Sequence, residues 1–270
     1  MSEQPNLDNW RGKWALITGA SAGIGKSLAQ LLAAGGANLI LTARRKDRLE
    51  QLAGDLRARN GVVVATFPAD LAQPSAPDSI FAYTQGKGIA LQLLANNAGF
   101  GAYGEFIKIP LRRQLDMVQV NISAVLHLTH LYLPQMIQRR SGDVLIVAST
   151  AAFQAVPYIA TYASTKSFDL FFAEALAAEM RPHGIRVCAL CPGSTETEFQ
   201  GVAGQPDNAL RAAESADKVA RVGLTALAQG KSMVISGFRN KLSVQGQRLA
   251  PRSLVSSMVT KIFRPREKEE

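Results

Sequence analysis

The chain has few of the residues that crosslinks and metal sites require. Only two of its 270 residues are cysteine and three are histidine. Cys188 and Cys191 lie three apart in an apolar run typical of a buried strand, where such residues point to opposite faces. His127 and His130 have no further ligand nearby. These counts exclude a disulfide framework, and a CxxC metal or redox site would lack its second ligand pair, so no metal site is predicted.

Long hydrophobic runs are also missing. No apolar segment approaches the roughly 20 residues that span a bilayer, and the first ten residues are mostly polar rather than the apolar core of a secretory signal. With so few cysteines, a reducing cytoplasmic setting is the simplest expectation.

Acidic residues are scarce relative to basic ones, 21 against 30, which gives a net charge of +9. Residues 241–270 contain seven Lys and Arg against three Glu and contribute +4 of this charge. The excess is partly a property of this basic tail, and by itself it does not indicate nucleic-acid binding.

Short apolar runs alternate with helical patterns along residues 1–240. This alternation predicts one α/β domain with a doubly wound, Rossmann-type fold, in which helices cover both faces of a parallel sheet of about seven strands. The expected strands are 13–18, 38–42, 62–67, 91–95, 143–148, 185–190 and 232–235. The expected helices are 24–34, 46–59, 75–85, 111–138, 162–181 and 215–228, with Pro134 expected to kink or end the fourth.

A glycine-rich turn, TGASAGIG at 18–25, joins the first expected strand to the first helix. Gly19 can make the tight turn, Gly23 lets backbone approach a ligand, and Gly25 lets the helix pack closely on the sheet. The helix start at Ile24 then offers free N–H groups and a positive dipole to a pyrophosphate. This context predicts a dinucleotide site.

The residues after the second strand favour NADP(H) over NAD(H). A carboxylate there would bind the ribose 2′-hydroxyl of NAD, but this chain has Arg44 and Arg45, whose guanidinium groups suit a 2′-phosphate. Ser21 could add a hydroxyl to the same phosphate. The alternatives are that both arginines are simply solvated, or that Asp47 binds NAD; we expect Asp47 in the first turn of the next helix, where its charge suits the dipole.

Tyr162 and Lys166 form a YxxxK pattern. Residues four apart share one face of a helix, so the phenol and the ammonium can point into one cleft. A nearby positive charge lowers the pKa of a tyrosine, and Tyr162 could then exchange a proton with a carbonyl or alcohol oxygen. Ser149, thirteen residues earlier at the end of a strand, could hold the substrate oxygen.

Taken together, these motifs resemble the short-chain dehydrogenase/reductase family, of NADP-preferring type, across about residues 10–240. TGxxxGxG, NNAG, a helical Asn, a Ser, YxxxK and a PG pair occur in order and at fitting spacings. The resemblance implies an oxidoreductase that acts on alcohols and carbonyls with NADP(H). Its catalytic residues would be Asn121, Ser149, Tyr162 and Lys166, with Asn121 holding a water that links Lys166 to solvent.

The resemblance also implies further cofactor contacts beyond the glycine turn and the two arginines. Tyr162 and Lys166 would contact the cofactor as well as the substrate. Loops after the third, fourth and sixth strands would contribute the rest, with Thr195 acting through its backbone and Thr197 through its side chain. The loop residues are Asp70, Leu71, Asn97, Ala98, Gly99, Pro192, Gly193, Thr195 and Thr197.

Assembly is expected from the resemblance too. Family members pair as homodimers or homotetramers, and here the helices carrying Asn121 and Tyr162 would lie at the interface.

The substrate is less well defined by sequence. Residues 194–212 contain Gly201, Gly204 and Pro206 and are expected to form a mobile lid. Aromatic and aliphatic residues flank the catalytic positions, which favours an apolar ketone or aldehyde, although several could instead pack in the core or between subunits. They are Phe100, Tyr103, Phe106, Phe153, Val156 and Tyr158.

The tail, 241–270, contains an amphipathic segment at 252–264. On a helix its apolar residues form a stripe flanked by Arg252, Lys261, Arg264 and Arg266. The segment could lie weakly on an anionic membrane surface, or pack on the domain or a second subunit. Two other functional classes stay open: a cofactor-sensing protein without turnover, and a peripheral membrane scaffold working through the tail.

Overall fold

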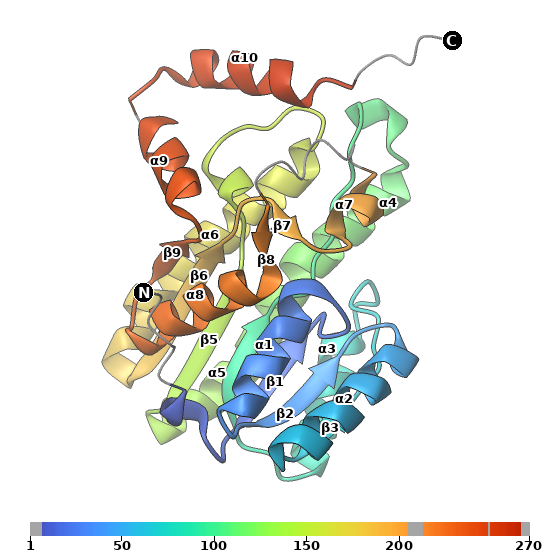
Figure 1. The fold of residues 1–270 in the computed structure, drawn as a ribbon, viewed down its shortest axis with the longest axis vertical. Coiled ribbons are helices and arrows are strands. Elements are labelled where there is room, and N and C mark those ends of the chain that lie inside the picture. The colour runs from blue at the N-terminus through green and yellow to red at the C-terminus, as the bar shows by residue number, and fades with distance from the viewer. Residues whose placement is uncertain (1–6, 205–212, 248, 266–270) are drawn as a thin grey trace.

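A computed structural model describes residues 7–204, 213–247 and 249–265. Seven strands form one parallel sheet in the order β3-β2-β1-β4-β5-β6-β9 (Figure 1). They are β1 (Trp14–Thr18), β2 (Asn38–Thr42), β3 (Val64–Thr66), β4 (Leu91–Asn96), β5 (Gly142–Val147), β6 (Ile185–Cys191) and β9 (Met233–Ile235). The predicted fold class and all seven predicted strands are confirmed.

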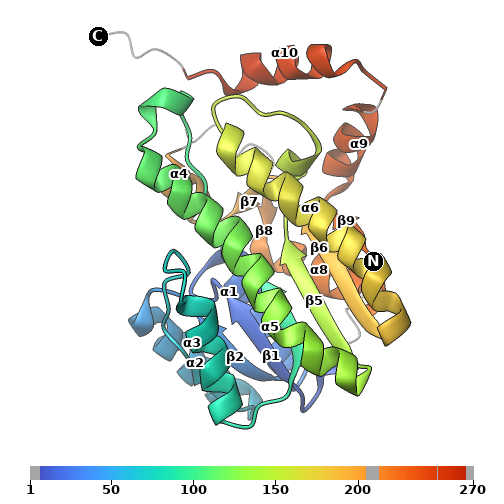
Figure 2. The same ribbon diagram turned by 180° about the vertical axis from the view of Figure 1, so that it is seen from behind.

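Helices cover both faces of this sheet. One face carries α1 (Gly23–Ala34), α2 (Lys46–Asn60) and α8 (Ala216–Ala228) (Figure 1). The other carries α3 (Ala76–Gly86), α5 (Ala124–Arg139) and α6 (Ala160–Met180) (Figure 2). Because water reaches neither face, the central strands are apolar at nearly every position.

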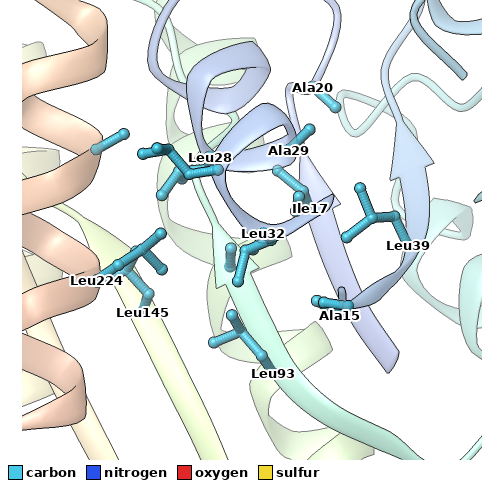
Figure 3. Close-up of a cluster of buried hydrophobic side chains, with 14 of the residues drawn as sticks. Ala15, Ile17, Ala20, Leu28, Ala29, Leu32, Leu39, Leu93, Leu145 and Leu224 are labelled. Carbon is cyan, nitrogen blue, oxygen red and sulfur yellow. The ribbon is translucent and has the colours of Figure 1, made fainter. Parts of the chain in front are cut away.

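Successive side chains along each strand point into two separate hydrophobic clusters, one on each face of the sheet. In β1, Ala15 and Ile17 point into the cluster beneath α1 and α8, beside Leu28 and Leu224 (Figure 3). Leu16 points into the cluster on the opposite face. The period of two along a strand thus divides a continuous apolar run between two cores.

The two cysteines follow the same rule. Cys188 belongs to the first cluster and Cys191 to the second, as their spacing in a strand predicted. Burial raises the pKa of the Cys188 thiol to about 12, and it raises the pKa of Cys191 as well. Both are free thiols held in a medium that disfavours their reactive thiolate form.

The predicted long helix 111–138 is wrong in two respects. It is divided into α4 (Leu111–Val118), a π-helical segment (Gln119–Ser123) and α5. It also continues through Pro134 to Arg139, so of the two effects that we expected of this proline, a kink or an early end, the early end is wrong. Pro134 removes one backbone donor, while Tyr132 and Met136 on either side are buried against the sheet and hold the helix in place.

Strand order reverses between β1 and β4. From these neighbours the chain proceeds outward in opposite directions, toward β3 on one side and β9 on the other. In open α/β sheets such a switch point leaves a crevice at the carboxyl ends of the strands, where ligands bind. The predicted site motifs follow β1, β4, β5 and β6 at this end.

Further elements lie beyond the carboxyl edge. They are β7 (Thr195–Glu196), paired with β8 (Glu214–Ser215), then α7 (Phe199–Ala203), α9 (Phe238–Gln247) and α10 (Arg252–Phe263). The boundary predicted at residue 240 falls inside α9, and residues 205–212 of the predicted lid lie outside the described residues. Among the described residues, no helix has the length and hydropathy needed to cross a membrane.

Candidate active site

The turn after β1 needs glycine, because neighbouring atoms leave no room for a Cβ at three of its positions. Gly19 and Gly23 have φ angles of +65° and +51°, which favour glycine. A Cβ at Gly19 would lie 2.9 Å from Ala98 Cα, and one at Gly23 would lie 2.8 Å from the methyl carbon of Thr197. A Cβ at Gly25 would lie 2.5 Å from Asn97 Nδ2. The glycines thus let three loops converge around one space.

The start of α1 has no side-chain cap. Its N-cap is Ala22, which cannot accept hydrogen bonds from the first-turn N–H groups, including that of Ile24. Those groups and the positive end of the helix dipole therefore suit a phosphate. The sequence predicts a pyrophosphate at this helix end.

Thr18 joins the glycine turn to the NNAG loop. Its hydroxyl accepts hydrogen bonds from the backbone N–H groups of Asn97 and Ala98, both at 2.9 Å, and donates to Ala95 O. Asn97 Nδ2 donates back to Thr18 O at 2.8 Å. Thr18, which is not among the predicted site residues, therefore fixes this loop.

Arg45 and Ser21, both predicted to bind one phosphate, are in direct contact. The Arg45 guanidinium donates to Ser21 Oγ at 3.1 and 3.3 Å, while Arg44 is exposed. Asp47 lies in the first turn of α2, also as predicted. This geometry favours Arg45 over Arg44 as the arginine that acts with Ser21.

Glu198 binds the arginines after β2 from across the cleft. Its carboxylate pairs with Arg45 at 2.7 Å and with Arg48 at 2.5 Å. Hydrogen bonds from both guanidinium groups lower the pKa of Glu198. No local signal predicts this contact, because about 150 residues separate the partners.

Tyr162 lies in an apolar cluster. It packs with Ala102, Met117 and Val156, and its ring centroid is 5.1 Å from that of Phe199. Burial raises the pKa of Tyr162 above its ordinary value, while the Lys166 charge and a hydrogen bond with Ser149 lower it. The expected effect of Lys166 thus has the predicted sign, but burial outweighs it.

Lys166 is buried and has two partners. Its ammonium donates to Val147 O at 2.7 Å and to Asp169 Oδ2 at 2.8 Å. Burial alone would lower the pKa of Lys166, but the Asp169 carboxylate and Tyr162 raise it on balance. Sequence reasoning missed Asp169, although a carboxylate three residues after Lys166 on the same helix was a usable signal.

Asn121 lies in the π-helical segment and is fully buried. Its amide accepts from the N–H of Phe100 at 3.2 Å and donates to Phe100 O and to Thr165 Oγ1, both at 3.0 Å. The π-helical turn is a feature often found at functional sites. Asn121 thereby links the loop after NNAG to the helix that carries Tyr162.

Gly99 lies where these groups converge. A Cβ there would lie 3.3 Å from Asn121 Oδ1 and 3.4 Å from Lys166 Nζ. Asn121 and Lys166 therefore border the same small volume, next to the NNAG loop. A glycine leaves that volume free for a ligand atom or a water.

The other predicted cofactor residues lie along the same edge. Pro192 O accepts from the N–H of Thr150 at 2.8 Å, which fixes the start of the segment after β6. A Cβ on Gly193 would lie 2.6 Å from Asn240 Oδ1. Thr195 is buried, and the hydroxyl of Thr197 accepts from Phe199 N–H.

In the loop after β3, the side chains of Asp70 and Leu71 have local structural partners. Asp70 accepts a hydrogen bond from the N–H of Ala72, in a tight turn, and the side chain of Leu71 packs into the hydrophobic core. Leu71 can therefore reach a cofactor only through its backbone.

The six predicted substrate-side residues divide into groups. Phe100, Tyr103 and Val156 belong to or pack against the cluster around Tyr162, whereas Phe153 packs in the core. The other two, Phe106 and Tyr158, border a small pocket that Ala102 and Met117 also line. Tyr158 has a φ of +66°, an uncommon conformation for a large side chain.

A family model described as short chain dehydrogenase matches residues 13–208. A very-long-chain 3-oxoacyl-CoA reductase of Phaeosphaeria nodorum is 38% identical over 181 residues, covering 66% of this chain and 53% of that protein. The chain thus spans about half the length of the long-chain reductases it matches.

Other relatives are covered almost completely. A 7beta-hydroxysteroid dehydrogenase of Collinsella aerofaciens is 30% identical over 243 residues, 88% of this chain and 91% of that protein. A structure of a short-chain dehydrogenase from Sphingobium yanoikuyae in complex with NADPH is 28% identical, covers 96% of this chain and 99% of its own, and superposes with a TM-score of 0.81. The match over most of the chain, the seven-stranded sheet and the clustered Tyr, Lys and Ser side chains agree. The chain belongs to the short-chain dehydrogenase family of NAD(P)-dependent oxidoreductases.

Proposed function

We propose that this protein is an NADPH-dependent reductase of an apolar ketone or aldehyde, which also runs in reverse. The observation that carries the proposal is Tyr162, which is buried in an apolar cluster beside Lys166 and Ser149 at the carboxyl edge of the sheet. A proton donor in apolar surroundings suits a carbonyl on an apolar molecule. The names of the long-chain acyl and hydroxysteroid relatives are consistent with such a substrate.

NADPH, when bound, supplies the hydride. The chain's own residues handle the oxygen. Ser149 orients the carbonyl oxygen beside the phenol, and Tyr162 donates its proton to that oxygen as negative charge develops there. Lys166 stabilises the phenolate that remains. Asn121, beside the same volume as Lys166, is suited to hold a water that returns the proton.

A preference for NADPH is supported by Arg45 and Ser21. Their contact at 3.1 Å gathers a guanidinium and a hydroxyl after β2, where an NAD-binding protein would use a carboxylate. The exposed Arg44 adds charge to the same place. Asp47 is directed to the start of α2 instead.

Turnover is tested with a series of ketones and aldehydes of increasing apolar bulk, following NADPH oxidation. We expect Tyr162→Phe to lower kcat by about 10²- to 10⁴-fold while leaving NADPH affinity unchanged. Phe168→Leu, on the same helix, is the control. Wild-type and Tyr162→Phe proteins that bind NADPH equally and turn over no carbonyl would favour the sensing protein without turnover.

Cofactor choice is tested by titrating NADPH and NADH separately, following nicotinamide fluorescence. We expect tighter binding of NADPH, a loss of that preference in Arg45→Ala, and a smaller loss in Arg44→Ala. Equal or tighter binding of NADH by the wild-type protein would contradict the preference and direct attention to Asp47.

Pairing of two copies is part of the proposal. Apolar side chains remain exposed on the helices that carry the catalytic residues and their neighbours, including Leu115 on α4, Leu126 on α5 and Phe171 on α6. A homodimer or homotetramer would cover them. Light scattering of the wild-type protein and Phe171→Glu checks this, and a wild-type monomer would contradict it.

A further inference from the structure

The last described helix, α10, lies across the end of the molecule that holds the candidate site (Figures 1 and 2). Val259 is buried in the cluster that contains Tyr162, and Val255 and Phe263 pack against it. Tyr103 donates a hydrogen bond from its hydroxyl to Phe263 O at 2.8 Å. The inner face of α10 therefore covers the apolar side of the site.

The outer face of the same helix is also apolar. Leu254, Met258 and Ile262 are four residues apart, so they form one row, and they are 53%, 58% and 75% exposed. An isolated exposed apolar residue is ordinary, but a row along a whole helix on the side away from the core is not.

A cationic stripe runs beside this apolar row. Ser257, Thr260, Lys261 and Arg264 line a hollow on α10. Thr260 already donates its hydroxyl proton to Ser256 O at 2.7 Å, so the donors left for a phosphate group are the Ser257 hydroxyl and the two cations. The helix thus has three sides: a buried apolar side, an exposed apolar row, and hydroxyl and cationic groups next to that row.

The charge of α9 and α10 indicates whether a second copy of the chain or a lipid surface binds the outer face of α10. Residues 238–265, which include α9 and α10, contain no Asp or Glu. Their exposed cations are Arg239, Lys241, Arg252, Lys261 and Arg264. Among the residues that the structure describes, none of these cations has an ion-pair partner, so a second copy docked through the same face would bring two like-charged sets together, which is unfavourable. An anionic lipid surface offers both negative charge and an apolar layer.

We propose that the outer face of α10 binds an anionic phospholipid surface. Leu254, Met258 and Ile262 enter the apolar boundary, while Lys261 and Arg264 contact lipid phosphates. The inner face of the same helix covers the site, so docking places the site entrance beside the lipid. This consequence rests on the proposed reduction of an apolar carbonyl, which would be taken up from the lipid phase.

Binding is measured with the full chain by sedimentation with two kinds of vesicle, phosphatidylcholine alone and phosphatidylcholine mixed with phosphatidylglycerol. We expect sedimentation with the mixed vesicles only. Lys261→Gln/Arg264→Gln should weaken binding roughly 10- to 30-fold, since each cation near an anionic surface contributes about a factor of five. Met258→Gln/Ile262→Gln should weaken binding by a comparable factor. Arg112→Gln and Phe171→Gln, exposed residues on α4 and α6, should not change it.

Three results would overturn the proposal. They are no binding to the mixed vesicles, equal binding to both kinds, or binding that neither α10 variant changes. A change of oligomeric state in the α10 variants without vesicle binding would instead identify a second copy as the occupant. NADPH affinity of each variant serves as the check on folding.

Turnover in detergent-dispersed substrate, without vesicles, separates the two proposals. Vesicle binding without any carbonyl reduction leaves the lipid surface standing and rejects the proposed function. Normal reduction without vesicle binding supports the proposed function and rejects the lipid surface.

Discussion

Lys166 Nζ lies 2.8 Å from Asp169 Oδ2, and both side chains are almost completely buried. A lysine that stabilises a phenolate would ordinarily carry an uncompensated charge; here a carboxylate one helical turn later neutralises it. The second oxygen of Asp169 is buried and has no hydrogen-bond partner among the described residues. Asp169 is therefore a positioning residue that holds Lys166 through one oxygen.

Asp169→Asn should move the alkaline limb of the pH profile for carbonyl reduction to lower pH. Reduction needs Tyr162 protonated and Lys166 charged, so activity falls as pH rises through the pKa values of these two groups. The Asp169 charge raises the pKa of both groups, and removing it lowers both. The profile of kcat/KM measures the shift.

Asp78→Asn is the matched control, because Asp78 is exposed and pairs with His127 away from the site. Asp169→Asn should also destabilise the fold by roughly 3 kcal/mol, since it leaves a buried charge without its partner. An unmoved limb in a folded variant would show that Asp169 has only a structural role.

Glu198→Gln should tighten NADPH binding by about 2- to 5-fold and leave NADH binding nearly unchanged. Glu198 competes with a 2′-phosphate for Arg45, and an exposed ion pair contributes only about 0.2–1 kcal/mol. The difference should fade at high salt. Fluorescence titration measures it, with Glu196→Gln as the control. Weaker NADPH binding in Glu198→Gln would mean that the carboxylate instead orients Arg45 for the phosphate.

Gly25→Ala should destabilise the protein by about 1–3 kcal/mol and weaken NADPH binding. The new Cβ would press against Gly19 and Asn97, which form the turn and its neighbouring loop. Gly54→Ala is the control, because its Cβ meets nothing within 4 Å in the middle of α2. Gly54→Ala should stabilise the protein by about 0.5–1 kcal/mol. Equal melting temperatures for the two variants would contradict the packing argument.

Asn121→Ala should lower both stability and kcat. It removes the hydrogen-bond partners of the Phe100 N–H and C=O, and each buried polar group left unpaired costs about 1–3 kcal/mol. Asn60→Ala, which loses one hydrogen bond at the end of α2, should cost less than about 1 kcal/mol. Chemical denaturation and steady-state kinetics measure the two effects. A stable variant with unchanged kcat would remove Asn121 from the proposed relay.

The strands and the glycine turn were predictable because their signals are local. A strand buried on both faces must be apolar throughout, and a turn that admits three converging loops must contain glycine. The proximity of Tyr162 and Lys166 was also predictable, since four residues of helix bring them to one face.

Contacts between distant segments were not predictable. The division between α4 and α5 leaves the apolar period almost unchanged, so the sequence predicted one helix. Nothing near Glu198 indicates that it reaches Arg45. The stripe expected at 252–264 is a helix, but only the fold determines that Val259 turns inward while Met258 turns outward.

The two segments on either side of the proposed cofactor site differ in how firmly they are held. On one side, the hydroxyl of Thr18, at the carboxyl end of β1, holds the NNAG loop through two hydrogen bonds of 2.9 Å. On the other, the segment containing Glu198 is tied across the cleft by solvent-exposed ion pairs with Arg45 and Arg48. A dinucleotide bound between them would contact one side that is already held in place and loses little entropy on binding, and another side whose ion pairs its phosphate would compete with. Raising the ionic strength should weaken the ion pairs of Glu198 and leave the hydrogen bonds of Thr18 unaffected.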